Sequence, residues 1–263
     1  MNILHISDIH FRRVYEIHDG GYKAIFNKMT NPVQLLEECA EEALKNSIDL
    51  VVVTGDLTEN GDAEDYRELR KVMDRIFQGI PYVVTLGNHD VKSAFWKGWF
   101  DEEPVNRPYN TVWKSGEVSV ISFDSSEEGN PDGKIRREQI EWLKEQTKLF
   151  AGKPSLLITH HHFMNEQGVV PPVECPEEFV KILADSGISG VLCGHTHHHF
   201  TSRFHGIPYF TADSMSFAGE EDSDGVKFEE KYGYSFYRFE DGMFKFHKIE
   251  TNSPGKRLGC VVF

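Results

Sequence analysis

Five short apolar runs, each followed within two residues by Asp, Asn or His, constrain the fold of this chain more than any other feature. The runs cover residues 2–6, 49–54, 81–86, 155–159 and 188–193. Short apolar runs that are rich in β-branched residues are typical of strands buried on both faces. We therefore predict five buried strands whose carboxyl ends all carry polar side chains.

Amphipathic stretches separate these runs and predict helices over residues 32–46, 63–77, 136–149 and 176–184. Asn31 is a suitable N-cap for the first helix, and Pro32 suits its first helical position. The alternation of strands and helices predicts a largely parallel sheet with helices on its outer face.

Residues 117–123, 200–212 and 232–249 instead contain short alternating segments, and Asp241-Gly242 is a hairpin signal between two of them. We expect these strands to be antiparallel. The predicted fold is α/β: a four-layer αββα sandwich, with two mixed β-sheets flanked by helices, in a single domain over residues 1–263. The acidic stretch 220–230 has few apolar residues and predicts a mobile loop, whose position also permits a lid over the site.

The charge of the chain excludes several classes of partner. Lys and Arg number 28 against 42 Asp and Glu, which gives a formal charge of −14. Proteins that bind nucleic-acid duplexes or anionic membranes need a basic face, so we expect neither partner. No apolar run approaches the roughly 20 residues of a membrane span, and the N-terminus is typical of a strand rather than a signal peptide. Four widely spaced cysteines suggest reduced thiols, and together these features favour a cytoplasmic protein.

The residues that follow the predicted strands suit metal coordination. In α/β sheets, ligands collect at the carboxyl ends of the strands. Oxygen and imidazole ligands without thiolate suit Mn, Fe or Zn, and bound cations would also offset the negative charge that repels phosphate. The residues at these ends are Asp8, His10, Asp56, Asn88, His89, His160, His195 and His197.

Five motifs, in this order along the chain, resemble those of the calcineurin-like metallophosphoesterase superfamily. The phrases around them are most similar to the branch that includes class III cyclic-nucleotide phosphodiesterases and glycerophosphodiesterases. The motifs are Asp8-x-His10, Gly55-Asp56, Gly87-Asn88-His89-Asp90, His160-His161 and Gly194-His195-Thr196-His197.

The resemblance implies a site with two metal ions and assigns a role to each matching residue. Asp8, His10 and His197 would hold the first ion. Asp56 would bridge the two ions, and the second would be completed by Asn88, His160 and His195. His89 would contact the phosphate and protonate the leaving group, with Asp90 orienting it. Family members use Mn, Fe or Zn, so the resemblance leaves the metal open.

Several neighbouring residues have alternative interpretations. His161 could replace His160 as the ligand, or could line the substrate pocket. Arg12 could reach a substrate phosphate, although arginine is more often a solvated surface residue. We expect His162, His198 and His199 at the rim of the pocket or behind the ligands rather than on a metal. For the aromatic segment 95–100, packing on a helix face is favoured over a wall for a nucleobase.

The sequence therefore predicts a dinuclear metal-dependent phosphoesterase. We expect a phosphodiesterase that hydrolyses cyclic nucleotides or small phosphodiesters by hydroxide attack at phosphorus. The alternative is a phosphomonoesterase that acts on a small molecule or a phosphoprotein. A catalytically silent scaffold is disfavoured, because every ligand position and His89 are present. The expected partner is a small phosphoester substrate. The sequence leaves open whether the protein forms a homo-oligomer.

Overall fold

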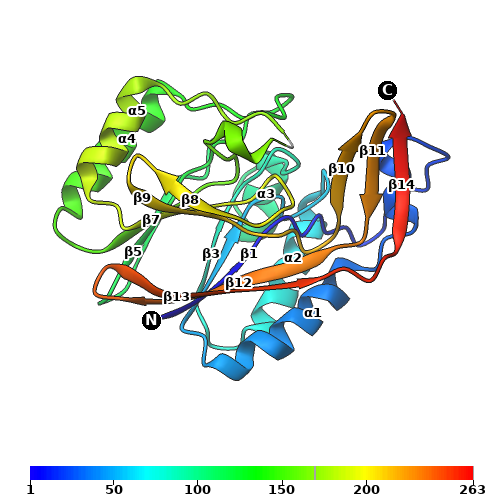
Figure 1. Ribbon diagram of the computed structural model, residues 1–263, viewed down its shortest axis with the longest axis horizontal. Helices are drawn as coiled ribbons and strands as arrows, with labels where there is room; N and C mark the ends of the chain where they lie inside the picture. Colours follow the sequence, from blue (N-terminus) through cyan, green and yellow to red (C-terminus); the bar gives the residue numbers. More distant parts are fainter. Residues whose placement is uncertain (169, 263) are drawn as a thin grey trace.

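A computed structural model describes residues 1–168 and 170–262. Two β-sheets pack face to face, and helices cover the outer face of each (Figure 1). The first sheet has the strand order β13 (Met243–Asn252), β12 (Tyr232–Glu240), β1 (Asn2–Ile6), β2 (Leu50–Thr54) and β3 (Tyr82–Thr85). The second has the order β4 (Thr111–Lys114), β5 (Ser119–Ser122), β6 (Ser155–Ile158), β7 (Gly190–Cys193), β9 (Ile207–Thr211) and β8 (Phe200–Phe204).

Five α-helices form the two outer layers. Helices α1 (Pro32–Ala43), α2 (Ala63–Ile76) and α3 (Lys92–Phe100) cover the first sheet, and α4 (Arg137–Leu149) and α5 (Glu177–Ser186) cover the second. Short 3₁₀ segments are η1 (Tyr22–Asn27), η2 (Leu44–Asn46) and η3 (Asn165–Gln167). Within the described residues, no helix is long and apolar enough to cross a membrane.

Three apolar cores separate these layers. Alternate residues of a central strand point to opposite faces, so Leu4 and Ile6 of β1 pack under the helices of the first sheet, while Ile3 packs between the sheets. In the second sheet, Leu157 faces α4 and α5, whereas Leu156 faces the first sheet. The predicted four-layer architecture with mixed sheets is confirmed.

The predicted local signals are largely present. Asn31 caps α1 by accepting a hydrogen bond from the Val33 amide at 2.9 Å, and Pro32 is the first helical residue. Asp241 and Gly242 join β12 to β13 with φ of 52° and 75°, as a two-residue hairpin turn requires. Two of the strands that we expected to be antiparallel also have a parallel neighbour: β5 pairs in parallel with β6, and β9 pairs in parallel with β7.

The aromatic segment 95–100 lies in α3, a helix whose bounds we did not predict although we expected the segment to pack on a helix face. Phe95, Trp96 and Trp99 are buried against the first sheet, which confirms the packing interpretation.

The prediction of a mobile loop over residues 220–230 is wrong. Strands β10 (Ala218–Asp222) and β11 (Gly225–Glu229) occupy it as a hairpin, and β14 (Arg257–Val262) completes a small third sheet. The acidic composition concealed an alternating pattern in which Val226 and Phe228 share one face of β11. That face packs toward η1 and Phe217 in a small apolar core. Pairing with β14, which we did not predict as a strand, stabilises the hairpin.

Candidate metal centre

The carboxyl ends of β1, β2, β3, β6 and β7 meet at one place between the two sheets, and the connecting loops bind to each other there. The Asp8 amide donates to the Gly55 carbonyl at 3.1 Å, and the Gly194 amide donates to the His160 carbonyl at 3.0 Å. Residues that are far apart in the sequence are therefore held side by side by backbone contacts.

Many residues at this edge have a strained backbone. A left-handed conformation costs a non-glycine residue roughly 1–2 kcal/mol and persists only where the surrounding structure enforces it. Such residues concentrate at functional sites. Those with φ between 46° and 74° are Asp8, His10, Asp56, His195 and His197.

Two glycines of the motifs permit close approach of the loops. A Cβ atom at Gly194 would lie 1.9 Å from the Ser7 hydroxyl oxygen and 2.7 Å from an Asp8 carboxylate oxygen. A Cβ atom at Gly87 would lie 2.2 Å from Oδ1 of Asp56. Any larger residue at either position would displace a carboxylate of the centre.

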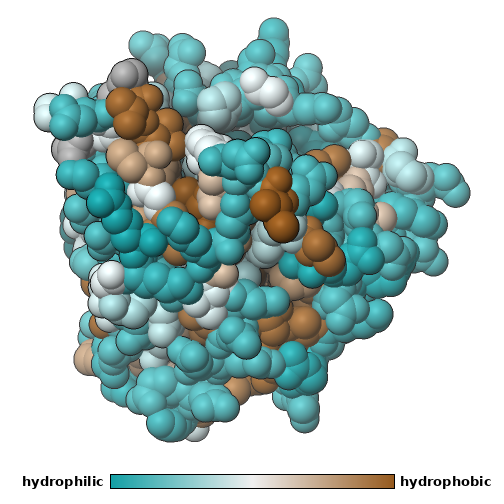
Figure 2. Space-filling view, turned by 90° about the vertical axis from the view of Figure 1, so that its right-hand side faces the viewer, coloured by the Kyte–Doolittle hydropathy of each residue, from teal (hydrophilic) through white to brown (hydrophobic). Residues whose placement is uncertain are grey.

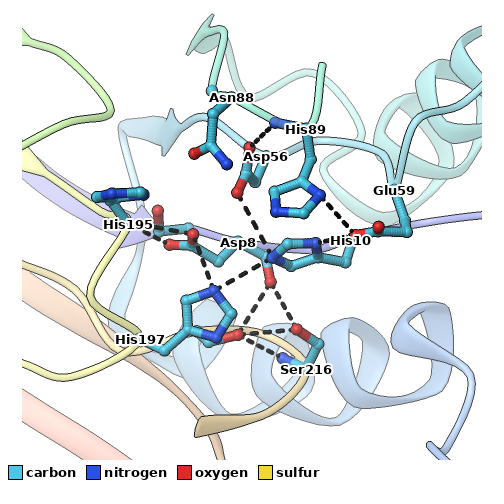
Figure 3. A network of polar contacts seen from close by, with 12 residues as sticks. Asp8, His10, Asp56, Glu59, Asn88, His89, His195, His197 and Ser216 are labelled. Atoms are coloured by element: carbon cyan, nitrogen blue, oxygen red, sulfur yellow. Dashed lines mark hydrogen bonds and ion pairs between the residues drawn. The ribbon is translucent and has the colours of Figure 1, made fainter. Parts of the chain in front are cut away.

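The first cluster contains Asp8, His10, Asp56 and His197, whose ligand atoms all lie within 4.8 Å of one another (Figure 3). Nε2 of His10 lies 3.2 Å from Nε2 of His197, which in turn lies 3.3 Å from Oδ1 of Asp8. Imidazole nitrogens and carboxylate oxygens that converge in this way form a donor set suited to a divalent cation.

The second cluster lies on the other side of Asp56. Nε2 of His160 is 3.4 Å from Oδ2 of Asp56 and 3.1 Å from Oδ1 of Asn88. The same Oδ2 atom is 3.6 Å from Nε2 of His10, so one oxygen of Asp56 faces both clusters. His195 stacks near His160, with ring centroids 4.9 Å apart.

A buried nitrogen without a hydrogen-bond partner indicates that the second cluster can accept a cation. Within the described residues, Nε2 of His195 is buried and has no hydrogen-bond partner. Buried polar atoms are rarely left unpaired. Burial lowers the pKa of His195 well below its usual value, so the ring is neutral and offers a lone pair. The residues present therefore fit a bound cation.

Hydrogen-bond partners that lie outside the two clusters orient three of the histidines. Nδ1 of His10 contacts Oε2 of Glu59 at 2.8 Å, Nδ1 of His160 contacts the Thr54 carbonyl at 2.8 Å, and Nδ1 of His197 contacts the Phe217 carbonyl at 2.6 Å. Each contact fixes its ring and leaves Nε2 facing the centre, the arrangement that metal-ligating histidines usually have.

The charges of the centre favour a cation as well. Burial raises the pKa of Asp56, but the opposing effect of His160, His89 and His10 is larger. The pKa of Asp56 therefore lies well below its usual value, and the carboxyl stays ionised. Burial lowers the pKa of His160, whereas Asp56 and Asp8 raise it to about 9. Without metal, the His160 ring is therefore doubly protonated and positively charged at neutral pH. A bound cation would replace one of the two protons.

His89 lies at the edge of the first cluster with its side chain 23% exposed. Its Nδ1 is 2.9 Å from Oε2 of Glu59, the oxygen that also contacts His10. Burial lowers the pKa of His89, but Asp56 and Glu59 raise it to about 9, so at neutral pH the ring carries a proton that it can donate.

The structure gives the orienting contact to Glu59 rather than to Asp90. The buried Asp90 carboxylate accepts hydrogen bonds from the amides of Gly87, Leu57 and Thr58 and from the Tyr66 hydroxyl. Asp90 therefore holds the loops after β2 and β3 together, and it acts on His89 through the backbone. Sequence reasoning missed Glu59, although it follows Asp56 by three residues within the phrase TGDLTENG.

His161 and Arg12 lie away from the open side of the centre. His161 is fully buried, with Nδ1 2.8 Å from the Ser125 hydroxyl and Nε2 3.1 Å from the Pro131 carbonyl. One of its ring nitrogens also lies within 4.8 Å of the ligand nitrogens of His160 and His195. The Arg12 guanidinium pairs with Asp65 at 2.9 Å and donates to backbone carbonyls in the Glu59 loop. These contacts favour supporting roles for both residues.

The three other histidines near the motifs also make contacts outside the clusters. His162 contacts the carbonyls of Met164 and Val170, His198 contacts the Gly219 carbonyl, and His199 lies 3.4 Å from Asp213. Their places match the expected positions behind or beside the ligands.

Replacing Glu59 with glutamine is expected to lower phosphodiester turnover by about 10- to 100-fold, because one oxygen holds both His10 and His89. Loss of the negative charge lowers the pKa of His89, so the proton-donating form is lost at a lower pH. The alkaline limb of the kcat profile should move to lower pH. A profile with an unchanged alkaline limb would show that Glu59 has no electrostatic effect on His89.

A family model described as "Calcineurin-like phosphoesterase" matches residues 1–199. The chain belongs to this family. The match covers all the residues of both clusters, and the members of the family are metal-dependent phosphoesterases.

Curated relatives of this chain are named as phosphodiesterases. A probable glycerophosphodiester phosphodiesterase of Arcobacter nitrofigilis is 31% identical over 242 residues, which cover 82% of this chain and 79% of that protein. A cAMP/cGMP dual specificity phosphodiesterase of Mycobacterium tuberculosis is 28% identical over 224 residues, or 82% of this chain and 67% of that protein. Among solved structures, a dimetal phosphatase of Danio rerio aligns with a TM-score of 0.59 at 12% identity, covering 87% of this chain and 95% of that one, which shows a common fold.

Proposed function

We propose that this family member is a dinuclear metal-dependent phosphodiesterase that hydrolyses cyclic nucleotides or other small phosphodiesters. The observation that carries the proposal is the position of Asp56, whose Oδ2 faces both clusters of ligand atoms. Asp8, His10 and His197 would hold one ion, and Asn88, His160 and His195 the other. The nitrogen and oxygen donors suit Mn, Fe or Zn.

When bound, two divalent cations lower the pKa of water and neutralise the charge on the phosphoryl oxygens. The protein residues supply what remains of the reaction. His89 donates a proton to the departing alkoxide, and Glu59 holds the His89 ring through Nδ1 so that Nε2 is the donating atom. The Asp56 carboxylate fixes the loop of His89 by accepting its amide hydrogen at 2.9 Å.

The preference for diesters rests on the relatives, whose names include both cyclic nucleotide and glycerophosphodiester phosphodiesterases. A phosphomonoesterase remains the alternative, because the same two-metal chemistry cleaves both kinds of ester. A silent scaffold is disfavoured, because the side chains of the seven candidate ligand residues and His89 converge on one centre.

We propose further that residues 1–263 form a single domain to which the small third sheet belongs, and that the protein acts in the cytoplasm on small phosphoesters. The contacts of Tyr22 with His89 and with Phe228 support the first part, since they join the third sheet to the candidate metal site.

Paired rates test the proposed function. The protein is stripped of metal, reloaded with Mn, Fe or Zn, and assayed on bis(p-nitrophenyl) phosphate and p-nitrophenyl phosphate, with metal content measured on the same samples. Faster diester cleavage supports the phosphodiesterase. Faster monoester cleavage would favour the alternative, and a protein that holds two ions but cleaves neither ester would favour the scaffold.

A further inference from the structure

The metal centre opens into a cavity of about 410 Å³ whose two sides differ in chemistry. One side carries ligand residues and His89. The other carries Tyr22 from η1, Phe217, and the hairpin of β10 and β11. The hairpin lies beyond residue 199, where the match to the family model ends, whereas Tyr22 lies within the match.

The hairpin turns one face toward the cavity. Gly219 of β10 pairs with Phe228 of β11, and Glu221 pairs with Val226. Paired residues lie on the same face of a sheet, and all four residues line the cavity. Glu220 is next to Glu221 on β10 and lies on the opposite face. Figure 2 shows that the side of the molecule carrying this sheet is mainly hydrophilic, with hydrophobic side chains in separate patches.

Aromatic rings connect the hairpin to the reacting groups. The Tyr22 ring lies 6.0 Å from His89 and 5.7 Å from Phe228, measured between ring centroids. Phe217 lies 5.9 Å from Phe228 and 4.5 Å from His197. An organic group attached to a phosphate at the metals would therefore lie against an apolar and aromatic wall.

The charge of the wall is negative. Among the described residues that line the cavity there is no Lys or Arg, and the side chain of Glu221 supplies a carboxylate beyond the aromatic rings. A second anion on the substrate would find no cation there. A cation would gain from both the carboxylate and the faces of the rings.

We propose that the wall formed by Tyr22, Phe228 and Glu221 selects phosphodiesters whose organic group is apolar near the phosphate and ends in a positively charged or hydrogen-bond-donating nitrogen. The proposal rests on the proposed phosphodiesterase function and adds the substrate class. Two kinds of compound share this chemistry: diesters of ammonium alcohols, and nucleotides whose base has an exocyclic amine.

Two matched substrate pairs distinguish these sources. The first is p-nitrophenyl phosphorylcholine and its neutral isostere, 3,3-dimethylbutyl p-nitrophenyl phosphate, which differ only in the charge. The second is cyclic AMP and the 3′,5′-cyclic phosphate of purine riboside, in which a hydrogen atom replaces the exocyclic amine. For each pair the ratio of kcat/KM values is measured in the metal-loaded protein, and the leaving group is the same within each pair.

We expect at least one ratio to favour the member that carries the ammonium group or the exocyclic amine by about three- to tenfold. Glu221→Gln should bring that ratio close to one, and added salt should reduce it in the unsubstituted protein. Glu220→Gln removes the same charge from the opposite face and should retain the ratio. Because Glu221 is exposed, its substitution leaves the folded core intact.

The substrate pair whose kcat/KM ratio changes in Glu221→Gln shows which of the two kinds of compound the wall selects. If the protein cleaves these diesters but Glu221→Gln changes neither ratio, or Glu220→Gln changes them equally, the proposed wall is wrong. If the metal-loaded protein cleaves bis(p-nitrophenyl) phosphate but none of the four diesters, the proposed substrate class is wrong. If it cleaves no diester at all, the phosphodiesterase function fails instead.

Discussion

Replacing Asp56 with asparagine is expected to reduce phosphodiester hydrolysis by at least about 1000-fold and to lower the metal content below two ions per chain. The reason is the place of Oδ2, which lies 3.4 Å from His160 and 3.6 Å from His10. An amide at this position keeps the shape of the side chain but removes the negative charge between the clusters. Elemental analysis and rates on bis(p-nitrophenyl) phosphate measure both effects.

Asp132→Asn is the matched control for this variant, because it makes the same change at an exposed position. It should retain both metal and activity. Two tightly held ions in the Asp56→Asn protein would contradict the bridging position that we propose for Asp56.

His89→Ala is expected to keep both ions and to lose turnover by about 100- to 10,000-fold, the usual contribution of a general acid. His89 contacts Glu59 and stands beside the ligands, so its removal leaves the donor atoms in place. The loss should be largest for diesters with a poor leaving group. It should be small for p-nitrophenyl esters, whose leaving group departs without a proton.

The comparison of leaving groups separates proton donation from general damage to the centre. His205→Asn provides a control, since His205 is an exposed turn residue with φ of 48°, a conformation that asparagine tolerates. An equal loss on good and poor leaving groups would remove His89 from proton transfer and leave it a role in phosphate binding.

The central part of the fold could be predicted because its signals are local. The run of residues 2–6 coincides with β1, and the Asn31-Pro32 signal starts α1 at the expected residue. The third sheet could not be predicted in the same way. Its hairpin depends on pairing with β14, which is about 30 residues away in the sequence, and acidic residues on the opposite face masked its alternation.

The candidate ligand residues could also be predicted, because each lies within four residues of the end of a strand. The contact between Glu59 and His89 was not, since it depends on how the loops after β2 and β3 pack. Asp90 is adjacent to His89 in the sequence, yet its carboxylate turns toward the backbone amides of Gly87 and Leu57. Proximity in the sequence was therefore a poor guide to which carboxylate orients the ring, and Tyr22 was missed for the same reason.

The left-handed backbone at the candidate ligand residues would link the amount of the protein in the cell to metal supply. Five ligand positions hold an unfavourable backbone conformation, and two of them carry buried carboxylates. Ions that bind only the folded chain stabilise it by about 4 kcal/mol when their free concentration is a thousand times the dissociation constant. A cell short of divalent metal would therefore contain a larger fraction of unfolded chains, which proteases degrade. Metal limitation would lower the amount of this protein as well as the activity of each molecule.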